Sequence, residues 1–256
     1  MSFFIALASQ CVVLFLAILA FLELGRRLGA RRLARDPEGS ERGLSSIEGA
    51  LFGLLGLLIA FTFSGAASRF EDRRGLVVEE ANDIGTAYLR VDLLPPEAQE
   101  PMRDLFRRYT DSRIETYRLV EDLPAAMASL QVTAALQKEI WKAAVEQARA
   151  GGPVAILLLP ALNEMIDITT TRTMATRRHP PGVIFGLLAG LALGCSLLAG
   201  YGMSGARRRS FVHMALFGLL ITITIYLIVD LEYPRAGLIR VDDFDQAIVD
   251  VRRSMD

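Results

Sequence analysis

The 256-residue sequence lacks most of the residue patterns that carry enzyme chemistry or nucleic-acid binding. Its two cysteines, Cys11 and Cys195, and its two histidines, His179 and His213, have no spacing typical of a zinc site. A glycine-rich phosphate loop, a nucleophile elbow and a metalloprotease motif are all missing. No basic patch is interleaved with aromatic residues, which argues against nucleic acid as a partner. We therefore expect a protein that is not an enzyme and that needs no cofactor or metal.

What the sequence does have is four long apolar runs, at roughly Phe3–Leu22, Ile47–Gly65, Val183–Gly202 and Phe211–Val229. Each run approaches the ~20 residues that a helix needs to cross the hydrocarbon core of a bilayer. Charged residues still make up 22% of the chain, so we expect a sizeable part outside the membrane. The middle thirds of the runs contain no acidic or basic residue, which argues against a proton-coupled pump or transporter.

The segment Ala66–Pro181 has the pattern of a helical domain. Residues 66–94 contain no proline, and apolar residues recur there at helical spacing, at Phe70, Val77, Ala81, Ile84, Tyr88 and Val91. This pattern predicts that the second apolar run continues as one long helix up to Pro95-Pro96. Further helices are predicted to begin near Pro96, Pro124 and Val154.

The predicted fold is an all-α integral membrane protein with four transmembrane helices and a helical soluble domain inserted between spans two and three. Residues 1–65 hold transmembrane helices 1 and 2 with a basic connecting loop. Residues 66–181 form the soluble domain, 182–229 hold transmembrane helices 3 and 4, and 230–256 form a C-terminal tail with a turn-like start.

The two short connections between spans are rich in arginine. Residues 23–46 hold six arginines against four acids, and residues 204–210 hold three arginines and no acid. The positive-inside rule places both connections in the cytoplasm, so the soluble domain and the tail are expected outside it. Six arginines at the two ends of the soluble domain count the other way, but long loops translocate largely regardless of charge.

Small residues recur on one face of two of the runs. Gly49 and Gly53 begin such a face in the second run, and the third run carries four glycines at intervals of four, at Gly182, Gly186, Gly190 and Gly194. Glycine costs a helix ~1 kcal/mol relative to alanine, so four in register need a reason. Close helix packing in the membrane supplies one. The sequence leaves open whether the neighbouring helix belongs to the same chain or to another subunit.

The second run also carries a candidate pore face. Leu57 and Phe61 lie one helical turn apart, and Ser64 follows at the end of the run. Around a symmetric axis, large apolar residues form a hydrophobic constriction that gates by excluding water. The alternative is that they face lipid or a neighbouring helix.

The order of spans and domain resembles the bestrophins, which are pentameric anion channels, and more closely a bestrophin-like family of bacterial membrane proteins whose activity is not established. The best local match is Phe61 followed by Ala-Ala-Ser-Arg-Phe-Glu-Asp-Arg-Arg at 66–74. Bacterial bestrophins carry small residues after a pore-helix phenylalanine and then Arg-aromatic-x-Glu-Ala-Arg. Arg69, Phe70, Asp72 and Arg74 fall on that pattern, with Asp in place of Glu.

The resemblance implies a homo-oligomeric ion channel in a bacterial inner membrane, with inorganic ions and lipid as its partners. Two features depart from the family. Thr62-Phe63 stands where bestrophins have Arg-Asn, which removes a cation from the pore exit. Bestrophins also keep their helical domain in the cytosol, opposite to the orientation that the arginines favour. The alternative function is a non-conducting membrane scaffold, or an envelope-sensing subunit that binds a partner through its helical domain.

Overall fold

A computed structural model describes residues 2–35, 44–119, 122–149, 151–205 and 211–256, and these residues form helices and turns without a strand. They divide into two compact units. The first, residues 1–68 and 179–238, is called the membrane unit here. The second, residues 69–178 and 239–256, is called the helical unit. Parts of both arginine-rich connections, at 36–43 and 206–210, lie outside the described residues.

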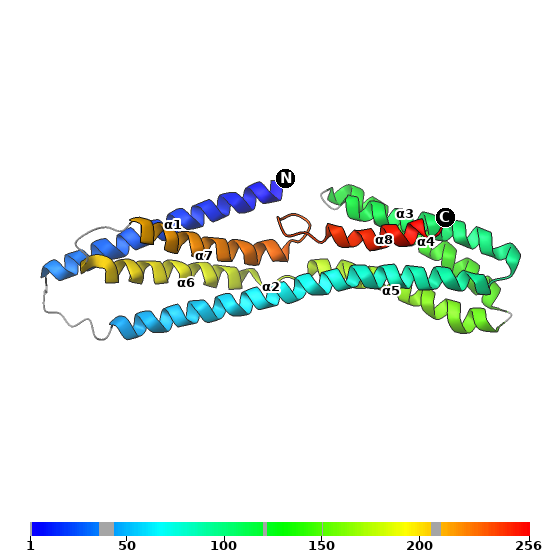
Figure 1. The fold of residues 1–256 in the computed structure, drawn as a ribbon, viewed down its shortest axis with the longest axis horizontal. Helices are drawn as coiled ribbons and strands as arrows, with labels where there is room; N and C mark the ends of the chain where they lie inside the picture. The colour runs from blue at the N-terminus through cyan, green and yellow to red at the C-terminus, as the bar shows by residue number, and fades with distance from the viewer. Residues whose placement is uncertain (1, 36–43, 120–121, 150, 206–210) are drawn as a thin grey trace. The chain divides into compact units, whose positions relative to one another are not determined.

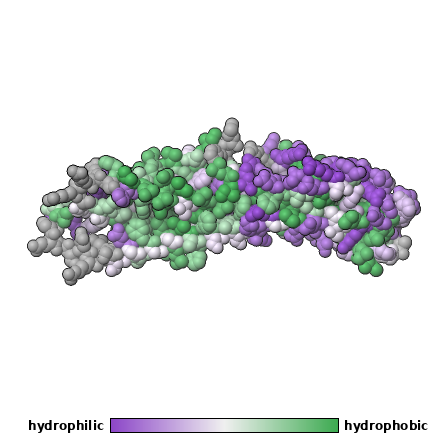
Figure 2. Space-filling model, in the orientation of Figure 1, coloured by the Kyte–Doolittle hydropathy of each residue, from purple (hydrophilic) through white to green (hydrophobic). Residues whose placement is uncertain are grey.

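The membrane unit holds the four apolar runs, and the structure confirms that each belongs to a helix long and apolar enough to cross a bilayer. These helices are α1 (Ser2–Arg35), α2 (Leu44–Leu89), α6 (Gly182–Gly202) and α7 (Phe211–Glu232), with a short 3-10 turn η4 (Met203–Gly205) after α6. α2 is one unbroken helix, and its residues from Arg69 onward belong to the helical unit. Apolar residues dominate the visible surface of α1, α6 and α7, whereas polar residues dominate that of the helical unit (Figures 1 and 2).

α1 packs closely against α6 and α7. Ile18 and Leu22 of α1 are fully buried and form a small core with Met214 of α7. Two glycines allow the helices to approach at this point. A Cβ on Gly25 would lie 1.9 Å from the carbonyl oxygen of Leu197, and a Cβ on Gly200 would lie 2.0 Å from that of Leu22. Only glycine fits at such distances, because the backbones themselves are in contact.

The helical unit continues α2 with four longer helices and several single turns. They are η2 (Arg90–Leu93), α3 (Pro96–Arg118), α4 (Leu123–Ala148), the π-helical turn η3 (Val154–Leu158), α5 (Leu159–Arg177), η5 (Asp242–Asp245) and α8 (Gln246–Arg253). Gly151 and Gly152, which separate α4 from η3, both have positive φ, which other residues rarely adopt. The predicted helix starts near Pro96, Pro124 and Val154 agree with these bounds to within a residue.

The core of the helical unit is apolar and draws on every helix in it. Ile84 of α2, Phe106 of α3, Ile140 of α4 and Leu162 of α5 have no exposed surface. Ile248 of α8 is also fully buried there, so the C-terminal segment is part of this core. Residues 230–256 were predicted to be a tail with a turn, and α8 was not predicted. A stretch of eight residues contains too few apolar residues to show a clear helical periodicity.

Candidate functional site

The membrane-spanning part of α2 has one packed face and one face that is largely exposed among the described residues. Leu55 and Ala66 are buried, and the ring of Phe52 lies edge-on to that of Phe217 with centroids 6.1 Å apart. On the opposite side of the helix, Leu57 is 51% exposed and Phe61 is 67% exposed. Within the most apolar 18-residue window of α2 only 11% is buried inside the chain. Most of this span therefore faces lipid or another protein chain.

The predicted pore residues lie together on this open face. At 3.6 residues per turn, Leu57, Phe61 and Ser64 point away from the buried face that Leu55 marks, and all three are exposed. Thr62, which replaces the arginine of bestrophins, turns its hydroxyl to its own helix and donates to the carbonyl oxygens of Leu58 and Ile59. That these residues line a pore stays a prediction.

The predicted packing glycines contact no other helix among the residues that the structure describes. A Cβ added to any of Gly49, Gly53, Gly182, Gly186, Gly190 or Gly194 would meet no atom within 4 Å. The close contacts of the membrane unit instead use Gly25 and Gly200, which the sequence analysis did not single out. The packing prediction for the six glycines is therefore a prediction about contacts with a second chain.

The motif residues after the span divide between two roles in the helical unit. Phe70 is buried, and the guanidinium of Arg74 lies 5.8 Å from its ring centroid and 4.1 Å from that of Phe244. Cation–π contacts at these distances hold the segment before α8 against α2. Arg69 and Asp72 instead line a groove on the surface of the unit. Phe70 and Arg74 of the motif therefore take part in packing within the unit, whereas Arg69 and Asp72 lie on its surface.

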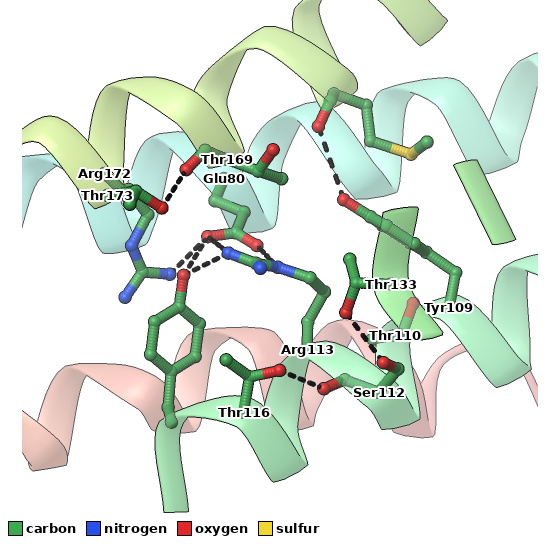
Figure 3. A network of polar contacts seen from close by, with 12 residues as sticks. Glu80, Tyr109, Thr110, Ser112, Arg113, Thr116, Thr133, Thr169, Arg172 and Thr173 are labelled. Atoms are coloured by element: carbon green, nitrogen blue, oxygen red, sulfur yellow. Dashed lines mark hydrogen bonds and ion pairs between the residues drawn. The ribbon is translucent and has the colours of Figure 1, made fainter. Parts of the chain in front are cut away.

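The helical unit also contains a buried ionic network centred on Glu80 of α2 (Figure 3). Nε of Arg113 donates to one carboxylate oxygen at 2.5 Å, and the hydroxyl of Tyr117 donates to the other at 3.0 Å. Arg172 of α5 donates to the same second oxygen and also lies 3.6 Å from a carboxylate oxygen of Asp245. Both guanidinium groups lie over the ring of Tyr117, at 4.9 and 3.8 Å from its centroid. The network ties α2, α3, α5 and η5 together.

The positive charges of the two arginines offset the cost of burying the Glu80 carboxylate. Burial alone would raise the pKa of Glu80, but Arg113 and Arg172 outweigh it and hold that pKa below its ordinary value. Glu80 is therefore an ionised carboxylate with no exposed surface. Such a group is suited to fixing helices in register rather than to exchanging protons.

Sequence reasoning missed Glu80, although a signal for it exists. Glu80 lies three residues after Val77 and four before Ile84, both of which belong to the predicted apolar face. A carboxylate on a buried helix face needs a cationic partner. The partners, Arg113 and Arg172, come from helices 33 and 92 residues away, and no local pattern identifies them.

Among the described residues, no group of three or more histidine, cysteine, aspartate or glutamate side chains is arranged to hold a metal ion. A search of curated proteins and a search of solved structures each returned no match to the chain. A model of the Bestrophin-like domain matches residues 4–244, which covers all four spans and nearly all of the helical unit. The chain therefore belongs to the bestrophin-like family.

Proposed function

We propose that this protein is an oligomeric ion channel whose conducting path is lined by α2 from several subunits. The observation that carries the proposal is the open apolar face of α2, on which Leu57 and Phe61 lie one turn apart and are largely exposed among the described residues. In a closed ring of subunits these side chains form two successive apolar rings. A narrow ring of this kind excludes water, so the closed state is held by dewetting.

Subunit assembly is part of this proposal. One chain contributes only one such face, and a pore needs several copies around an axis, as in a ring with cyclic symmetry. The unpartnered glycines of α2 and α6 offer surfaces where helices of neighbouring subunits approach closely. We place the helical unit outside the bilayer, inserted between spans two and three, because its surface is mainly polar (Figure 2).

The proposal is tested by ion flux through purified protein in liposomes. The double variant Leu57→Ala/Phe61→Ala widens and wets the constriction, so its conductance should be at least several times that of the wild type. Leu216→Ala/Leu220→Ala is the matched control, because these α7 leucines are similarly exposed and have the same spacing. The control should conduct like the wild type. Absence of flux from wild type and variant, with several ions and both signs of voltage, contradicts the channel.

We expect at most a weak preference for anions. The hydroxyl of Thr62 is bonded within its own helix, and Phe63 is apolar, so this position offers passing anions neither a cation nor a free donor. Reversal potentials in a chloride gradient measure the preference. A strong selectivity for chloride over potassium would show that another cation acts in the pore.

A second candidate is a scaffold or sensing subunit that binds a partner through the helical unit. An exposed apolar cluster where η2 and η3 meet favours it. Leu89 and Ile156 are 72% and 71% exposed, and Arg90 ties the two turns together by donating to the carbonyl oxygen of Leu157 at 2.6 Å. Oligomeric state in detergent separates the candidates. A closed ring of identical subunits supports the channel, whereas a monomer or a stoichiometric complex with another protein supports the scaffold.

A further inference from the structure

A groove of about 450 Å³ lies between α2 and α5 on the helical unit. α2 lines it with Arg69, Asp72 and Glu79, and α5 and the residue after it contribute Thr171 and Arg178. The lining contains arginines and acids in equal number and no aromatic side chain. Six of its ten lining residues are charged, and the two signs balance.

Arg73 holds the groove in shape. This side chain is buried, and it donates to the carbonyl oxygens of Ala175 and Arg178 at 3.2 and 2.8 Å. These carbonyls belong to the end of α5, where helix geometry leaves acceptors without an intrahelical donor. Arg73 therefore fixes the end of α5 against α2, and the two walls of the groove keep their spacing.

Three of the charged side chains that line the groove form no ion pair with another described residue. Asp72, Glu79 and Arg178 form no ion pair within the ranges that the structure describes, although all three border the same space. The neighbouring Glu71, by contrast, is paired with Arg74 at 2.5 Å. Opposite charges that line one groove without forming an ion pair can bind a ligand that carries both a positive and a negative group.

The order of these charges along the chain indicates which end of a ligand would lie nearer the membrane spans. Arg69 follows the end of the second apolar run at Gly65 by four residues, and Arg178 precedes the start of α6 by four residues. Both cations are thus close along the chain to membrane spans. Asp72 and Glu79 lie three and ten residues beyond Arg69 on α2, about 4.5 and 15 Å at the rise of an α-helix. In a phospholipid head group the phosphate is likewise nearer the acyl chains and the ammonium group farther out.

We propose that this groove binds the head group of a membrane phospholipid with a primary ammonium group, such as phosphatidylethanolamine. The guanidinium of Arg178 binds the phosphate, and the carboxylate of Asp72 accepts hydrogen bonds from the ammonium. A trimethylammonium group has no proton to donate and is normally held by aromatic rings, which the groove lacks. A head group with only negative charge meets the acids of the groove and is repelled.

The proposal rests on the membrane location of the chain and not on ion conduction. It is tested with full-length protein in detergent by native mass spectrometry, after addition of phosphatidylethanolamine, phosphatidylcholine or phosphatidylglycerol with identical acyl chains. We expect retention of phosphatidylethanolamine above the other two. Asp72→Asn or Arg178→Gln should lower this preference about tenfold, the effect of one charge-assisted hydrogen bond.

Asp104→Asn and Arg108→Gln on α3 are the matched controls, because both residues are exposed and lie outside the groove. The controls should keep the wild-type preference. Equal retention of the three lipids, or an unchanged preference in Asp72→Asn and Arg178→Gln, overturns the proposal. Soluble glycerophosphoethanolamine is a further arm. If it displaces the lipid at equal concentration, the site binds a free phosphoester and the lipid assignment is wrong.

Discussion

Glu80 is the buried carboxylate at the centre of the ionic network in the helical unit. Its carboxylate has no exposed surface and accepts hydrogen bonds from Arg113, Arg172 and Tyr117. Burying an ion costs several kcal/mol, so a buried pair stabilises a fold only when it is well paired and hydrogen-bonded. Removing one partner is different, because it leaves the opposite charge buried without compensation.

The change Glu80→Gln should therefore lower the free energy of unfolding by about 3–5 kcal/mol, because Arg113 loses its counter-ion inside the protein and Arg172 keeps only Asp245. Thermal unfolding in detergent measures the change. Glu100→Gln is the control, since Glu100 pairs with Arg107 on the exposed surface of α3 and should leave the melting temperature nearly unchanged. A Glu80→Gln variant as stable as the wild type would mean that the two arginines are compensated by other groups.

The raised pKa of Asp83 predicts that the free energy of unfolding depends on pH. Partial burial, together with the negative charges of Glu79, Glu164 and Glu80, raises the pKa of Asp83 to about 6. In an unfolded chain an aspartate has a pKa of about 3.9. Between these values the folded state binds more protons than the unfolded state, so stability falls as the pH rises from about 4 to about 6. Melting temperatures should show this slope in the wild type and a shallower one in Asp83→Asn. Equal slopes would contradict the shift.

At the scale of helices, the glycines fall into two groups that sequence alone does not separate. Gly25 and Gly200 let the backbones of α1 and α6 touch, whereas Gly186 and Gly190 meet no atom of their own chain. The regular four-residue spacing drew attention to the second group. The first group has no such spacing, and its role depends on which helices become neighbours.

Opposite outcomes are expected when the two groups are substituted. Gly200→Ala places a Cβ against the carbonyl of Leu22, so it should lower the free energy of unfolding by about 1–3 kcal/mol. Gly186→Ala meets open space in the chain and should leave the fold intact.

Gly190→Leu should keep the fold but reduce oligomer size, because a bulky side chain separates helices of neighbouring subunits. Thermal unfolding and light scattering in detergent measure the two effects. An unchanged oligomer in Gly190→Leu would show that this face meets lipid.

Sequence reasoning located the helices well and their partners poorly. Apolar runs identify the spans, and Pro96, Pro124 and the Gly151-Gly152 pair mark helix boundaries, because these signals are local. α8 was not predicted because the burial of its residues, such as Ile248, depends on contacts with α2 and α3 that are distant in the sequence. For the pore candidates, the spacing of Leu57 and Phe61 predicted a shared face. Their exposure within the chain depends on how α2 packs, and that information is not local.

At the scale of the whole molecule, the orientation in the membrane stays a prediction. The helical unit includes both residues 69–178 and residues 239–256, so in the proposed topology these segments share one side of the membrane. A periplasm-dependent reporter fused through a linker after Asp256 therefore reports on the entire unit. The arginine-rich connections predict that it is active and that a reporter inserted at Arg207–Arg209 is silent. The reverse pattern would support the cytosolic domain of bestrophins.

The packing of Ile248 into the core of the helical unit has a consequence for biosynthesis. The ribosome makes residues 69–178 first, then α6 and α7, and only afterwards the residues that close this core. Until then the apolar groups beneath α8 lack the cover that α8 provides. A chain shortened before α8 therefore keeps all four spans but leaves the apolar groups beneath α8 in the helical unit exposed.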